Sequence, residues 1–178
     1  MGIPPGGNMI DKVKAKVKKV IKEATAFPAE FTLAELTRSD TAKRLGIENQ
    51  PTGETLNNLR KTAHNLLKVR ALFRTVDIYH WDVQHAVLVN SGYRSPELNK
   101  HIPGSSNTSA HTLGWAADIK VPAYGSAYQV AAKIAESGIK FDQLIYEYDS
   151  WVHISFDPRM RQQTLTINKS GTFAGLHL

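Results

Sequence analysis

The most informative stretch of this sequence is Ser109-Ala-His-Thr-Leu-Gly-Trp-Ala-Ala-Asp118, and the shorter run Trp151-Val-His153-Ile-Ser155 completes it. The first stretch places a histidine and a carboxylate seven positions apart, and the second is strand-like with a single histidine. Two imidazoles and one carboxylate fill three tetrahedral positions of a catalytic zinc ion and leave the fourth to water. A bound zinc ion acidifies that water, so such a site makes a nucleophile without a reactive side chain. We therefore expect His111, Asp118 and His153 to bind one zinc ion.

The same three side chains have other interpretations. Two core histidines and an ion pair at a strand end would place similar residues without any metal. A set of two histidines and one carboxylate also binds iron in oxygenases. Those enzymes usually have His-x-Asp or His-x-Glu spacing, which this chain lacks. The chain has no cysteine, so disulfides are excluded and a metal must be held by His, Asp or Glu.

The two runs resemble the M15 family of zinc peptidases, whose pattern is Ser-x-His-x-x-Gly-x-Ala-x-Asp followed by Trp-x-His. A third element, Ser91-Gly-Tyr-Arg94-Ser-Pro, matches the Gly-Tyr-Arg turn of that family. The resemblance runs from Phe31 to Phe156. The family contains D-Ala-D-Ala carboxypeptidases and many phage endolysins, and its fold is shared by the hedgehog signalling domain. The resemblance implies an α+β fold: a small, mostly antiparallel sheet with helices packed on it.

The family resemblance also implies a general base, which many members carry three residues before the last histidine. Ser150 occupies that position here, and the nearby carboxylates are Glu147 and Asp149. Side chains alternate between the two faces of a strand. A three-residue loop over 148–150 would put Glu147 on the face of His153, whereas a two-residue turn would put them on opposite faces. We expect Glu147 to be the base, as in the sub-branch that this chain resembles, with Asp149 as the alternative.

Three further residues have expected roles near the metal. Arg94 is expected to stabilise the developing oxyanion or to hold a substrate carboxylate, because a fixed guanidinium suits both tasks. Its structural alternative is an ion pair that ties the turn to the core. Ser109 is expected to orient a ligand by a hydrogen bond, and Tyr93 to bind substrate or to pack beside the site. The other histidines have no partner at ligand spacing, although His101 could line the cleft: they are His64, His80, His85, His101 and His177.

Local patterns predict the elements that surround these motifs. Apolar residues at helical spacing predict longer helices over 10–24, 52–67 and 127–137. Capping residues predict short helices after Thr32, Ser39 and Ser95. β-Branched runs predict strands over 86–90 and 115–121 and a hairpin over 141–156. The pattern after Pro158 is weak, so we divide the chain into a basic leader and helix (1–30), a peptidase domain (31–160) and a C-terminal tail (161–178).

The net charge of +6 over 178 residues is unevenly distributed. Residues 1–74 contain 14 Lys or Arg and 7 Asp or Glu, whereas residues 75–178 contain 8 and 9. The lysines from Lys12 to Lys22 could therefore attract an anionic envelope polymer. The alternative is a solvated helix surface, with the apolar side of that helix packed on the domain. No motif predicts specific nucleic-acid binding.

The sequence has no apolar run of the roughly 20 residues that a membrane helix needs. Its first residues also lack the charged and apolar regions of a secretory signal. The resemblance implies a zinc peptidase that acts on peptidoglycan stem peptides. We expect a phage lysis enzyme or virion-associated lysin, made in the cytoplasm and delivered to the wall by another protein. The alternatives are a non-catalytic structural or binding module with this fold and a bacterial carboxypeptidase that trims D-Ala-D-Ala ends.

Overall fold

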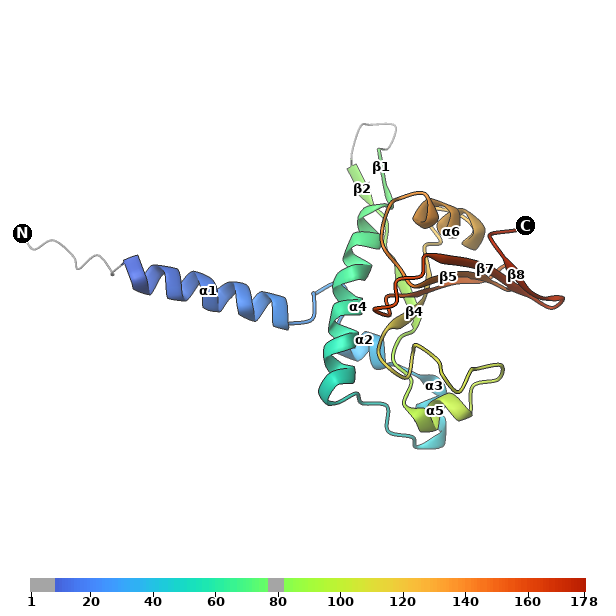
Figure 1. Cartoon of the computed structure of the whole chain (residues 1–178), viewed down its shortest axis with the longest axis horizontal. Helices are drawn as coiled ribbons and strands as arrows, with labels where there is room; N and C mark the ends of the chain where they lie inside the picture. Colours follow the sequence, from blue (N-terminus) through green and yellow to red (C-terminus); the bar gives the residue numbers. More distant parts are fainter. Residues whose placement is uncertain (1–8, 77–81) are drawn as a thin grey trace, which may run out of the picture.

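The centre of the domain is a six-stranded sheet with the strand order β3-β4-β6-β5-β7-β8 (Figure 1). A computed structural model describes residues 9–76 and 82–178, except for the side chains of residues 18–25. Residues 1–8, the first part of the predicted leader, lie outside the described residues. All neighbouring strands are antiparallel except β5 and β7, which are parallel. The strands are β3 (Leu88–Ser91), β4 (Ala116–Lys120), β5 (Gln143–Glu147), β6 (Trp151–Ser155), β7 (Gln163–Asn168) and β8 (Gly171–Ala174), with β1 (Arg74–Val76) and β2 (Asp82–Gln84) paired separately. The expected mostly antiparallel sheet is confirmed.

Helices surround this sheet, which confirms the α+β class (Figure 1). The short helices begin where capping residues predict, because the hydroxyls of Thr32, Ser39 and Ser95 each accept a bond from a backbone N–H three residues later. Ser126 and Gln129 form a reciprocal capping box at the start of α6. The helices are α1 (Met9–Thr25), α2 (Leu33–Thr37), α3 (Asp40–Leu45), α4 (Gly53–Ala71), α5 (Pro96–Lys100) and α6 (Ala127–Ala135).

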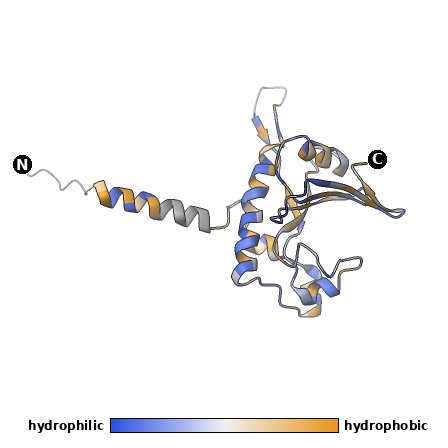
Figure 2. Cartoon of the chain, viewed as in Figure 1, coloured by the Kyte–Doolittle hydropathy of each residue, from blue (hydrophilic) through white to orange (hydrophobic). Residues whose placement is uncertain are grey.

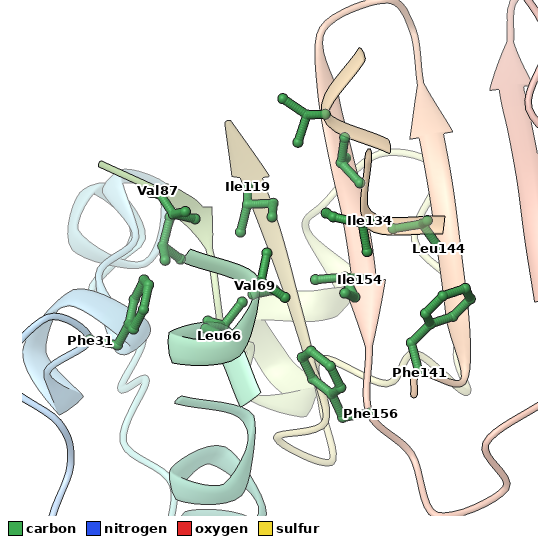
Figure 3. Close-up of a cluster of buried hydrophobic side chains, with 14 of the residues drawn as sticks. Phe31, Leu66, Val69, Val87, Ile119, Ile134, Phe141, Leu144, Ile154 and Phe156 are labelled. Carbon is green, nitrogen blue, oxygen red and sulfur yellow. The ribbon is translucent and has the colours of Figure 1, made fainter. Parts of the chain in front are cut away.

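One face of the sheet forms the hydrophobic core with α4 and α6 (Figure 3). Side chains alternate along each strand, so the odd positions of β4 and the even positions of β5 and β6 face this core. The buried residues include Ile119, Leu144 and Ile154 of the sheet, Leu66 and Val69 of α4, and Ile134 of α6. The opposite positions of the same three strands are therefore free to form a site on the other face.

Helix α1 extends away from the domain (Figure 1). All its described side chains, residues 9–17, are exposed, including Met9, Ile10, Val13 and Val17, of which 52–79% is accessible. Apolar and polar residues alternate along this part of the helix (Figure 2). The expectation that its apolar side packs on the domain is therefore wrong for residues 9–17, because amphipathic spacing shows that an apolar face exists without saying what covers it.

The C-terminal part of the chain completes the sheet. The weak pattern after Pro158 predicts no strand, yet β7 pairs with β5 and β8 pairs with β7. The six residues of β7 include two threonines and few large apolar residues, so their strand character comes from pairing more than from hydrophobic alternation. Among the described helices, none is long and apolar enough to cross a bilayer.

Candidate metal centre

His111, Asp118 and His153 lie together on the sheet face opposite the core. His111 Nε2 is 3.1 Å from Asp118 Oδ1 and 3.1 Å from His153 Nδ1, and His153 Nδ1 is 2.9 Å from Asp118 Oδ1. Ligand atoms at about 2.0–2.2 Å from one tetrahedral zinc ion lie roughly 3.3 Å from one another. The three side chains therefore fit the ligand set of a single small cation.

Strand pairing brings two of the three ligands together. Asp118 on β4 is directly opposite His153 on β6, and opposite residues of antiparallel strands have Cβ atoms about 4.5–5.5 Å apart. His111 comes from the turn that precedes β4. The backbone carbonyl of that histidine accepts bonds from the N–H groups of Arg94 and Gly114, which fix the turn against the Gly-Tyr-Arg segment.

The tautomer of His111 is set by a backbone carbonyl. Its Nδ1–H donates to Gly92 O at 2.6 Å, so the neutral ring presents the Nε2 lone pair to the site. That lone pair, the Asp118 carboxylate and the His153 imidazole converge on one point. A bound cation satisfies such a convergence of electron-pair donors, whereas a buried core histidine would need donors around it.

Burial and charge keep the ligands in the forms that bind metal. Burial lowers the pKa of His111, which is completely inaccessible, and keeps its ring neutral. Burial alone would raise the pKa of Asp118, but the two facing imidazoles outweigh it and hold that pKa well below the ordinary value. A neutral imidazole and an ionised carboxylate are the required ligand states.

The glycine between the first two ligands is required by a close approach to α4. Gly114 has φ +75°, and a Cβ there would lie 2.5 Å from the carbonyl oxygen of Thr55. Asn58 and Thr62 of α4 donate to the carbonyl oxygens of Leu113 and Gly114. The helix therefore holds the end of the turn from which β4 and its Asp118 begin.

Glu147 lies on the same sheet face as the metal ligands. It pairs with Trp151 across the β5–β6 turn, whose three loop residues include Tyr148 and Asp149 at positive φ. This is the loop length that places Glu147 and His153 on one face, and Glu147 lines the same cleft as His153. Asp149 does not line that cleft, and its carboxylate accepts a bond from the Tyr146 hydroxyl instead.

Arg94 and Ser109 also line the cleft, whereas Tyr93 does not. The Arg94 guanidinium donates to Ser109 Oγ at 3.4 Å, and its buried Nε has no partner within the described structure. No carboxylate of the described residues lies within 4.0 Å of it, so the alternative role of Arg94, a structural ion pair, is not observed there. Burial lowers the pKa of Arg94. Tyr93 is buried in the core, which agrees with a packing role.

Asn49, a residue that no sequence pattern indicates, holds the Arg94 turn in place. Asn49 is buried, donates to the carbonyl oxygens of Thr37 and Tyr93, and accepts a bond from Ser95 N at 2.7 Å. Asn49 therefore holds Tyr93 and Ser95, the residues on both sides of Arg94, by hydrogen bonds. A single polar residue in a connecting segment gives no periodic signal, so no pattern in the sequence indicates this role.

The candidate metal centre lies in a cleft of about 1120 Å³, large enough for a peptide segment. Its walls come from the start of α3, the 102–110 loop, the β5–β6 turn and residues 157–161. Trp151 of the Trp-x-His motif also lines the cleft, as do three cations without a sequence signal, Lys120, Arg159 and Arg161.

The remaining described histidines lie outside this cleft. His101 caps its own helix turn by a bond from Nδ1 to Glu97 O, so it does not line the cleft. His64, His85 and His177 bond to Ala26 O, Thr75 Oγ1 and Ala174 O respectively. His80 lies outside the described residues. Within the part of the chain that is described, two histidines and one carboxylate converge in a metal-binding arrangement only at His111, Asp118 and His153.

Comparison with known families agrees with this geometry. A family model described as Peptidase M15 matches residues 29–155, which is more than half of the chain and contains all three ligands, Arg94 and Glu147. Comparison with curated proteins gives no significant match. The extent of the family match shows that this chain belongs to the M15 peptidase family.

Proposed function

We propose that this M15 peptidase is zinc-dependent and hydrolyses peptide bonds in peptidoglycan stem peptides. The observation that carries the proposal is the convergence of His111, Asp118 and His153 on one point in a cleft, with Glu147 on the same face of the sheet. Two imidazoles and one carboxylate leave a fourth position open, as catalytic zinc sites require. The peptidoglycan substrate rests on the resemblance to wall-cutting members of the family.

The residues around the ligands supply the rest of the chemistry. When bound, zinc would acidify a water molecule and polarise the scissile carbonyl. Glu147 accepts the proton of the attacking water and later gives it to the leaving amine. Burial raises the pKa of Glu147. A carboxylate with a raised pKa is a better proton acceptor, which suits this role.

Arg94 lines the same cleft as Glu147. Its guanidinium has no carboxylate partner among the described residues, so an anionic oxygen of the substrate would supply the missing counter-charge. That oxygen is either the developing oxyanion of the scissile carbonyl or the terminal carboxylate of the peptide. The second possibility corresponds to a carboxypeptidase that trims D-Ala-D-Ala ends.

Mass spectrometry of digested cell walls tests this proposal directly. We expect the zinc-loaded protein to release muropeptides with a newly formed peptide end from purified sacculi, and the His111→Ala variant to release none. Loss of only the terminal residue identifies a carboxypeptidase, whereas a cut inside the stem or cross-bridge identifies an endopeptidase. Sacculi that stay intact with folded, zinc-loaded protein would contradict the proposal and favour a non-catalytic binding module.

We further propose that α1 raises the affinity for an anionic envelope polymer without contributing to the chemistry. The described lysines Lys12, Lys14 and Lys16 are all exposed on a helix that extends from the domain. Exposed charges attract a polyanion, and salt weakens this attraction by shortening the screening length to about 8 Å at physiological strength. The accompanying role, a phage lysis or virion-associated enzyme made in the cytoplasm, rests on the family resemblance alone.

Deleting residues 1–25 tests the role of α1. Binding to intact walls should fall at low salt, and the difference from the full chain should shrink at high salt, as a sedimentation assay can measure. Hydrolysis of a small soluble muropeptide should be nearly unchanged, because the described side chains of α1 are exposed and line no part of the cleft. A lower melting temperature together with lost activity on the soluble peptide would instead show that the helix is structural.

A further inference from the structure

We propose that Lys120 binds a carboxylate of the substrate, so that the cleft prefers peptides that carry a negative charge close to the scissile bond. This inference rests on the proposed function and adds a specificity-determining residue to it. Nothing in the metal-ligand pattern or in the base assignment requires a cation at this position.

The position of Lys120 follows from strand geometry. Asp118 and Lys120 are two residues apart on β4, so their side chains leave the same face of the sheet. Both residues line the cleft. Two residues of a strand span about 6.5–7 Å, which places the lysine beside the metal centre, on the side where Ser150 and the β5–β6 turn form the wall.

The charge of Lys120 is not neutralised by the protein. Its ammonium donates to the neutral Ser150 Oγ at 3.3 Å. Over residues 9–76 and 82–178, no carboxylate oxygen is found within the 4.0 Å of an ion pair with this lysine. The side chain is half-buried rather than fully solvated. A partly desolvated, unpaired cation on a cleft wall favours an anionic ligand.

Arg159 and Arg161 of the same cleft provide a contrast, whereas Arg94, which also lacks a carboxylate partner, is already assigned to the scissile carbonyl or the terminal carboxylate. Arg161 makes two bonds to the buried Asp142, at 2.7 and 2.6 Å, and Arg159 donates to Asp157 at 2.8 Å. Carboxylates of the protein therefore already neutralise both charges, and these ion pairs hold the 157–161 segment in place. Lys120 has no such partner, which is why we assign the recognition of the substrate charge to it rather than to either arginine.

The distance from the metal centre limits where the substrate charge lies. An extended peptide advances about 3.3–3.6 Å per residue, so a group beside Lys120 belongs to a residue one or two positions from the scissile bond. A carboxylate suits an ammonium group because the hydrogen bond is charge-assisted. A carboxamide at the same position would have the same shape and would lose this charge.

A double-mutant cycle on binding tests the assignment. The probes are the peptide L-Ala-γ-D-Glu-L-Lys-D-Ala-D-Ala and its counterpart with D-isoglutamine, in which a carboxamide replaces the free α-carboxylate. Isothermal titration uses the full zinc-loaded chain carrying Glu147→Gln, so that neither peptide is turned over. We expect the carboxylate peptide to bind about 10-fold tighter, and Lys120→Gln to remove this preference. Lys133→Gln, at an exposed position of α6, is the matched control and should retain it.

The outcomes separate this inference from the proposed function. Equal affinity for the two peptides with Lys120 present would overturn it, as would an absence of binding by both. An equal loss of affinity for both peptides in Lys120→Gln would show a merely structural role and would also overturn it. If sacculi are not digested but the Lys120-dependent preference is present, the cleft recognises acidic peptides without cutting them. In that case the hydrolytic function fails and the inference stands.

Discussion

His111→Ala should remove bound zinc and peptidase activity together. The substitution leaves two ligands where the site presents three, and it removes the ring that Gly92 O orients. Changes in the groups that merely orient a ligand already cost about 10–100-fold in metal affinity or activity. We therefore expect a loss of more than 10²-fold, with zinc content measured on the purified protein and turnover on a soluble muropeptide.

Two further variants control for misfolding. His64→Ala changes a histidine of α4 that lies outside the cleft, so it should keep both zinc and activity. His153→Ala removes a different ligand from a different strand and should reproduce the loss. Circular dichroism checks that each variant folds. Unchanged metal content in a folded His111→Ala protein would refute the assignment of this ligand.

Glu147→Gln should leave zinc bound while turnover falls by about 10²–10⁴-fold. The amide keeps the shape of the side chain but cannot accept a proton from water. The pH dependence follows from the same group: burial raises the pKa of Glu147, and the protonated carboxyl is no base. The activity of the native protein should therefore rise with pH through a pKa above that of an ordinary glutamate, as kcat measured against pH can show.

Asp149→Asn is the matched control for the base. Asp149 contacts the Tyr146 hydroxyl and does not line the cleft, so this variant should keep most of the activity. If Glu147→Gln stays active and Asp149→Asn does not, the base is Asp149. In that case the directions of the two side chains in this structure, with Glu147 lining the cleft and Asp149 outside it, would differ from those in the active enzyme.

Much of the candidate site could be anticipated because strand geometry is regular. A buried strand carrying Asp118 and another carrying His153 need only to be neighbours for the two side chains to meet, and β4 and β6 are neighbours. The face of Glu147 depended on loop length alone, and the three-residue loop is confirmed by the pairing of Glu147 with Trp151. Local caps, such as Ser39 and Ser95, predicted helix starts in the same way.

The features that could not be anticipated depend on contacts between distant segments. The clamp by Asn49 joins residues 44 positions apart in the chain, Asn49 and Tyr93, and no local pattern encodes it. The exposure of Val13 and Val17 depends on the absence of a covering surface in the described structure, which spacing cannot reveal. Strand alternation predicts that Lys120 lies on the face of Asp118. Its proposed role depends on the absence of a neighbouring carboxylate among the described residues, which the sequence alone cannot show.

The parallel pairing of β7 with β5 has a consequence for the solution behaviour of the protein. The family match ends at residue 155, before β7 begins. Without β7 and β8, the strand that carries Glu147 would be an open edge, and its free N–H and C=O groups would be a template for joining to another molecule. Instead, the outermost strand on this side of the sheet is β8, only four residues long and exposed throughout, and β3 forms the other edge. Strands β7 and β8 therefore separate the strand that bears Glu147 from the edge of the sheet. The edge strand on that side has only four residues, which leaves few free backbone groups for pairing with another molecule.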